Sequence, residues 1–118
     1  MPKGIMVVQS HPCDPAREDE YNEWYDSVHL PDVLAVPGVR SARRFKLADG
    51  PRSDPAPGEY VAVYELDADD LAQVERDMRA AHDRGDMPVS RALQLGPTLY
   101  YEALPDRTDL GGGRSDSL

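Results

Sequence analysis

The sequence predicts one α+β domain with the order strand, helix, strand, strand, helix, strand. Four segments rich in β-branched and aromatic residues indicate strands, at residues 4–10, 39–47, 59–66 and 98–104. Two other segments carry apolar residues at three- and four-residue spacing, as in helices that cover one face of a sheet. The 118 residues suffice for a core, so we expect a single domain at 1–104 and a disordered polar tail at 105–118.

Composition argues against several classes of partner. The chain has 22 acidic and 13 basic residues and a net charge of -9, which disfavours attraction to nucleic acids and anionic membranes. Cys13 is the single cysteine, so an internal disulfide or a CxxC metal or redox motif is excluded. The apolar run near the N-terminus is too short for a signal peptide or a membrane span, so we expect a cytoplasmic protein with no membrane partner.

The first strand is a continuous apolar run at residues 4–10, ended by His11 and Pro12. Asp14 before Pro15 is a typical helix start, because the aspartate accepts from free amides and proline has no amide to leave unpaired. The helix that follows has its apolar face at Tyr21, Trp24, Tyr25 and Val28.

A helix break is predicted beside His29, which lies one turn beyond Tyr25 on the flank of this face. Pro31 lacks an amide hydrogen and disfavours helical geometry at Leu30. A further short turn is expected at residues 32–36. The histidine is therefore expected at an exposed helix end.

The second strand is predicted at residues 39–47, where Arg43 and Arg44 point to opposite faces. Residues 49–58 are almost all turn formers, so we expect a mobile connection. The third strand, residues 59–66, has no plainly solvated face.

The second helix begins at residues 67–70, whose aspartates can cap it, and Gly85 is a plausible stop. Its core stripe is Leu71, Val74, Met78 and Ala81, with His82 at the edge. A helical turn is expected near residues 90–95, and Pro97 introduces the fourth strand, residues 98–104.

This order of elements predicts a ferredoxin-like antiparallel sheet with both helices on one face. The strands carry large side chains on both faces, so the uncovered face would expose an apolar patch. We therefore expect a homodimer that packs sheet to sheet.

Four short motifs resemble the EthD-like branch of the dimeric α+β barrel superfamily, at residues 23–25, 29–32, 37–38 and 42–45. The resemblance extends over residues 4–104 and implies the same fold and a barrel-shaped homodimer. The superfamily includes lactone isomerases, polyketide-type cyclases, cofactor-free monooxygenases and haem enzymes. In the similar lactone isomerases, a histidine at the position of His29 lies in the substrate cavity.

His29 is the leading catalytic candidate, because a neutral imidazole can take and give a proton near neutral pH. The alternative is that His29 only caps the broken helix or binds a loop carbonyl. Tyr25 and Asp32 are the candidates to contact the ring, and a carboxylate there would fix its tautomer and raise its basicity. The alternatives are that Tyr25 is a core residue and that Asp32 caps the turn at 32–36.

Five side chains are candidates for substrate binding: Trp24, Arg43, Tyr64, Tyr100 and His82. An inward arginine could hold an enolate or carboxylate oxygen, and tyrosines could form an aromatic wall with hydroxyl donors. A surface salt bridge would equally explain Arg43, and packing at a dimer interface would explain the tyrosines.

We therefore expect a small cofactor-independent enzyme that moves a proton in a hydrophobic oxygenated molecule, such as a lactone or a polyketide intermediate. The reaction would be of the isomerase, cyclase or dehydratase type. Two alternatives remain: a cofactor-free monooxygenase of phenolic substrates, and a non-catalytic ligand-binding or accessory dimer. No zinc-type ligand spacing or glycine-rich phosphate loop occurs in the sequence, and we expect no metal and no other cofactor.

Overall fold

A four-stranded antiparallel sheet forms the base of the molecule in a computed structural model that describes residues 4–49 and 58–105. Its strands lie in the order β2-β3-β1-β4. They are β1 (Gly4–Pro12), β2 (Val39–Lys46), β3 (Tyr60–Leu66) and β4 (Leu93–Glu102). The predicted α+β fold and element order are confirmed. The connection predicted at 49–58 and the tail predicted at 105–118 lie, apart from their end residues, outside the described ranges.

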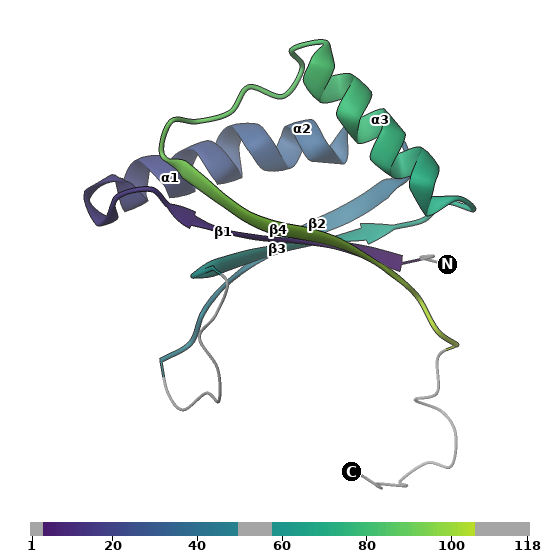
Figure 1. The fold of residues 1–118 in the computed structure, drawn as a ribbon, viewed down its shortest axis with the longest axis horizontal. Helices are drawn as coiled ribbons and strands as arrows, with labels where there is room; N and C mark the ends of the chain where they lie inside the picture. Colours follow the sequence, from purple (N-terminus) through teal and green to yellow (C-terminus); the bar gives the residue numbers. More distant parts are fainter. Residues whose placement is uncertain (1–3, 50–57, 106–118) are drawn as a thin grey trace, which may run out of the picture.

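The helices all lie on one face of the sheet (Figure 1). A short 3-10 turn η1 leads into α1, the π-helical segment η2 and α2, and the separate helix α3 follows β3. Their bounds are η1 (Pro15–Arg17), α1 (Glu18–Trp24), η2 (Tyr25–His29), α2 (Leu30–Leu34) and α3 (Leu71–Asp83). None of the helices within the described ranges is long and apolar enough to cross a membrane.

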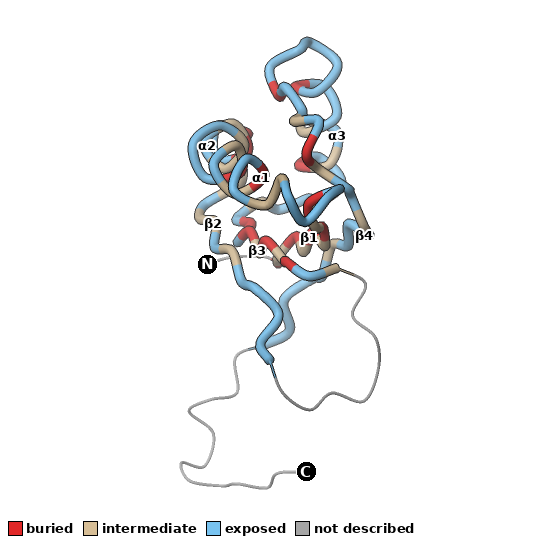
Figure 2. Tube along the Cα trace, turned by 90° about the vertical axis from the view of Figure 1, so that its left-hand side faces the viewer, coloured by how far each residue is buried: buried red, intermediate tan, exposed pale blue. Residues whose placement is uncertain are grey.

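The core lies between the sheet and these helices, where buried residues gather in Figure 2. Alternate residues of β1 and β3 are buried, because successive side chains of a strand point to opposite faces. Tyr21 and Tyr25 pack down from the helices and are 0% and 2% exposed. Val28 was predicted on the same apolar face but is 36% exposed, so that prediction is wrong.

The first helix does not break at Pro31, contrary to the prediction. Leu30 has helical angles, φ -59 and ψ -46, and its amide donates to the carbonyl of Tyr25, five residues earlier. In an α-helix the proline ring would clash with the carbonyl four residues before it. The wider π turn gives the ring room, so the helix continues to Leu34.

Predicted caps are confirmed at two helix starts. The Asp14 side chain accepts from the amide of Ala16 at 2.9 Å, and Asp70 accepts from the amide of Ala72 at 3.0 Å. Gly85 follows α3 with a φ of +83, a conformation that glycine adopts without strain.

The fourth strand begins five residues earlier than predicted, so the helical turn expected at 90–95 is wrong. His11 and Pro12 extend β1 by pairing with Gln94 and Leu93. Pro97 is tolerated because β4 is an edge strand and its register with β1 shifts between Val8 and Ser10. The pairing partner, which is distant in sequence, thus decides where the strand starts.

The opposite face of the sheet is covered by no described element. Large apolar side chains stand on it, including Phe45, Leu99 and Tyr101, which are 44%, 49% and 49% exposed. Arg43 lies on this face and its guanidinium is 5.2 Å from the centre of the Phe45 ring.

Candidate functional site

A cavity of about 570 Å³ lies between the sheet and the helices, and we call it the sheet–helix cavity. Its size falls in the range usual for small-molecule sites. Most of its wall is apolar, formed by residues such as Met6, Val8, Val33, Met78, Met87 and Leu93. Five residues predicted to belong to the site line it together: Trp24, His29, Tyr64, His82 and Tyr100.

The π-helical segment sets the position of His29. The ring of His29 stacks on Trp24, with centroids 4.7 Å apart and planes at 21°. Residues five apart lie on different faces of an α-helix but come close together when the turn widens. Tyr25 meets the same imidazole edge-on, with centroids 5.1 Å apart. The histidine is thus held between two aromatic rings at the wall of the cavity.

His29 is held in its neutral form. Burial lowers the pKa of His29 from 6.5 to about 4, and the nearby Asp32 carboxylate only partly opposes this effect. Its Nδ1 is buried and has no hydrogen-bond partner among the residues described. The ring makes no capping hydrogen bond to the helix, so the capping interpretation of His29 is wrong.

Two tyrosines bring hydroxyl groups to the cavity. The hydroxyl of Tyr64 is buried close to that of Tyr25, but it makes no hydrogen bond of regular geometry to that or any other described residue. Burial raises the pKa of Tyr64 strongly, and burial followed by the Glu75 carboxylate raises that of Tyr100. Both phenols are therefore neutral donors at physiological pH.

Three predicted site residues do not line this cavity. Tyr25 is buried beside His29, and Asp32 lines a neighbouring pocket, where its Oδ2 is buried without a hydrogen-bond partner in the described part of the chain. Asp32 makes no capping hydrogen bond there, so the capping alternative is not observed. Arg43 lies on the uncovered face of the sheet.

The rim of the cavity carries a charged pair that was not predicted. Glu75 and Arg79 of α3 form an ion pair there, one turn apart, and His82 follows on the same side of the helix. The sequence does contain the signal for this arrangement, because residues three and four apart share a helix face with Met78 of the core stripe.

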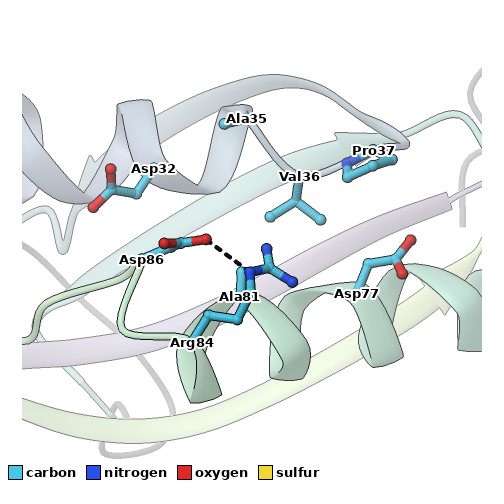
Figure 3. Close-up of a pocket in the computed structure, with 8 residues that line it drawn as sticks. All are labelled: Asp32, Ala35, Val36, Pro37, Asp77, Ala81, Arg84 and Asp86. Carbon is cyan, nitrogen blue, oxygen red and sulfur yellow. Dashed lines mark hydrogen bonds and ion pairs between the residues drawn. The ribbon is translucent and has the colours of Figure 1, made fainter.

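Two other hollows lie close to this cavity. A pocket of about 370 Å³ lies between α2 and α3 (Figure 3). Asp32 and Asp77 stand on its opposite walls, and the guanidinium of Arg84 donates to Asp86 at 3.0 Å. A groove of about 530 Å³ lies outside Trp24, whose indole NH donates to the carbonyl of Pro88 at 3.2 Å. The sheet–helix cavity is the better ligand site, because its wall is largely apolar and carries the imidazole of His29 and the hydroxyl groups of Tyr64 and Tyr100.

No metal-binding site is evident in residues 4–49 and 58–105. No group of three or more histidine, cysteine, aspartate or glutamate side chains there could hold a metal ion.

Comparison with known proteins supports the fold. No family model and no curated protein matches the sequence. Among solved structures, HapK from Hahella chejuensis matches with a TM-score of 0.60 and 20% identity, over 97% of this chain and 99% of that chain. An ethyl tert-butyl ether D (EthD) family protein from Bacillus halodurans C-125 matches with a TM-score of 0.53 and 19% identity, over 88% of this chain and 100% of that chain. The predicted resemblance is thus confirmed in the fold, and the chain has the α+β fold of an EthD family protein.

Proposed function

We propose that this protein is a small cofactor-independent enzyme that moves a proton within an apolar, oxygenated small molecule, with His29 as the base. One observation carries the proposal: a neutral histidine and an unpaired buried hydroxyl, that of Tyr64, belong to the wall of one apolar cavity. Buried polar atoms without partners are rare in folded proteins, so a ligand that pairs with them would remove a real cost.

The chemistry follows from these groups. His29 takes a proton from a carbon next to a carbonyl group, and the electron pair moves onto the carbonyl oxygen to give an enolate. Tyr64 donates a hydrogen bond to that oxygen. The protonated His29 then returns its proton to a different carbon, which is an isomerisation, or to a departing hydroxyl, which is a dehydration. Because Nδ1 is buried, Nε2 is the nitrogen that would face the substrate.

The low pKa of His29 leaves the ring unprotonated at neutral pH, so it can accept a proton, but it also makes the ring a weaker base than an ordinary imidazole. The hydrogen bond from Tyr64 to the enolate oxygen must offset this weakness. The stacked indole of Trp24 and the methionine side chains offer an apolar surface for a ring-shaped substrate such as a lactone or a polyketide intermediate.

The test uses deuterium exchange, which needs no knowledge of the product. The protein is incubated in D₂O with a panel of unsaturated lactones and polyphenolic acids, and NMR follows loss of the proton next to the carbonyl. We expect exchange with the unchanged protein and a loss of at least about 100-fold for His29→Asn, because general base catalysis contributes that much. His11→Asn, in β1 outside the cavity, is the control.

Exchange that persists in His29→Asn would contradict this role of His29. Oxygen uptake with phenolic substrates would instead favour a cofactor-free monooxygenase, in which His29 deprotonates the phenol. Binding without exchange or oxygen uptake would leave the non-catalytic ligand-binding dimer as the better account.

We also propose that the protein acts as a homodimer joined through the uncovered face of the sheet. Phe45, Leu99 and Tyr101 are each more than two fifths exposed there, and a contiguous apolar surface of this kind favours association.

A further inference from the structure

Arg44 is a largely buried cation that the proposed reaction does not use. Its side chain is 12% exposed, although it belongs to the edge strand β2. The guanidinium donates to Asp26 Oδ1 at 2.9 Å and to Asn22 Oδ1 at 2.7 Å. Its Nε is buried and lacks a partner in the described residues. A charge held away from water acts on its surroundings more strongly than a solvated one.

Three tyrosine rings surround this guanidinium. The centroids of Tyr25, Tyr60 and Tyr21 lie 4.4, 5.1 and 5.3 Å from its central carbon. Tyr21 shares a 2.6 Å hydrogen bond with the buried hydroxyl of Ser10. The Tyr25 ring contacts both the guanidinium of Arg44 and the imidazole of His29. The positive charge of Arg44 therefore lies one ring away from a residue of the cavity wall.

The register of β2 and β3 connects Arg44 with the cavity wall. Arg44 pairs with Ala62 and Ala42 pairs with Tyr64, so Arg44 and Tyr64 are diagonal neighbours on the helix-covered face. Diagonal neighbours in an antiparallel pair lie roughly 7–8 Å apart at their backbones, within reach of long side chains. The charge of Arg44 also counteracts part of the rise in the pKa of Tyr64 that burial causes.

The other charges do not cancel this effect. Asp26, the ion-pair partner of Arg44, is 63% exposed, so water screens its charge in part and it offsets only part of the effect of Arg44. Arg79 is the only cation among the residues that line the described cavity; it is 68% exposed and already paired with Glu75. Arg44 is therefore the main source of positive potential close to Tyr64.

We propose that Arg44 is a positioning residue that orients the tyrosines behind the cavity and makes the cavity selective for ligands that carry or develop negative charge on an oxygen next to Tyr64. This inference rests on the proposed function, because it assumes that ligands occupy the sheet–helix cavity. It narrows the substrate class to phenols and to carbonyl compounds that form enolates.

The test uses 4-nitrophenol, which absorbs visible light as the phenolate, and nitrobenzene as its uncharged counterpart. Quenching of Trp24 fluorescence reports binding, because Trp24 is the single tryptophan and lines the cavity. The absorbance of bound 4-nitrophenol across pH gives the proportion of phenolate.

We expect Arg44→Met to reduce the preference for phenolate over nitrobenzene by roughly 3- to 30-fold, as loss of a partly screened charge at this distance implies. Arg44→Lys should restore part of the preference. Asp26→Asn, an exposed change that removes the opposing charge, should shift the preference in the other direction even if Arg44→Met fails to fold. Arg40→Met, the control, removes a 55% exposed arginine from the same strand.

Two outcomes would overturn the inference, and they are distinguishable. If neither probe binds the unchanged protein, both this inference and the cavity as a ligand site fail. If both probes bind but neither Arg44→Met nor Asp26→Asn changes the preference, only the role of Arg44 fails.

Discussion

At the scale of single residues, His29 behaves very differently from a histidine in water. Its imidazole lies between the rings of Trp24 and Tyr25, and its pKa falls from 6.5 to about 4 because burial penalises the charged form. The nearby Asp32 would favour the charged form, but burial outweighs it. The same burial that makes His29 a free base at neutral pH must therefore cost stability in acid.

We predict that His29 makes the protein less stable as the pH falls from about 6.5 to about 4. In this window the unfolded chain binds a proton that the folded chain does not, so the free energy of unfolding decreases as the pH falls. The stabilising contribution of neutral His29 is complete above pH 6.5. The difference between the two pKa values corresponds to at most about 3 kcal/mol of unfolding free energy. Solvent screening at the partly exposed ring makes the contribution smaller than this limit. Urea denaturation across this range measures it.

The matched variants are His29→Asn, which should lose this part of the pH dependence, and His82→Asn, which should keep it. Glu18 and Glu20 have lowered pKa values and add their own dependence in acid, so the difference between variants is the informative quantity. Equal slopes for the unchanged protein and His29→Asn would contradict a depressed pKa for His29.

At the scale of elements, the π-helical segment joins fold and site. It keeps the helix continuous through Pro31, and it brings Trp24 and His29 together. A π turn holds one residue more than an α turn, and such turns occur frequently at functional sites. Val28 lies within it and is 36% exposed, so its side chain contributes little to the core.

We predict that deleting Val28 converts this segment into a regular α-helix while the flanking helices keep their register. Stability should fall by roughly 3 kcal/mol, because in a regular α-helix the ring of Pro31 meets the carbonyl four residues before it. The histidine, now four residues after Trp24, should still lie beside the indole, because residues four apart share one face of an α-helix. Its pKa should therefore stay near 4, which the fluorescence of Trp24 measures as a function of pH.

The control for the deletion is Val28→Ala, which keeps the residue count and should keep a transition near pH 4. A deletion variant whose transition moves towards pH 6.5 would show that the extra residue of the π turn is needed to position His29.

At the scale of the whole molecule, the sheet has one face covered by helices and one uncovered (Figure 1). Val7, Val63 and Leu99 stand on the uncovered face with Phe45 and Tyr101. Covering such a surface removes apolar area from water, worth about 25 cal/mol for each Å². A second copy offers the same surface in self-complementary form.

We predict that Leu99→Glu prevents the proposed dimer from forming, because it would place a charge within the proposed contact. Size-exclusion chromatography with light scattering should then give a mass near the 13.1 kDa of one chain. Val28→Glu, on the helical side, should not change the mass. An unchanged protein that already runs as a monomer would contradict the proposed association.

The element order and the helix starts follow from the sequence alone, because they depend on local causes. Alternating or continuous apolar runs fix the strands, and Asp14 and Asp70 cap their helices through bonds to residues two positions away. The local motif also predicted His29 as a site residue, together with the aromatic residues Trp24 and Tyr25 before it.

The tertiary structure decided what depends on distant partners. Pairing with β1 starts β4 at Leu93, and pairing with β3 turns Arg44 towards the helices and Arg43 to the open face. Local rules for proline predicted a break where the structure has a π turn and a continuous helix instead. The cavity itself exists only where side chains from both helices and three strands converge, and no single segment of the sequence contains that information.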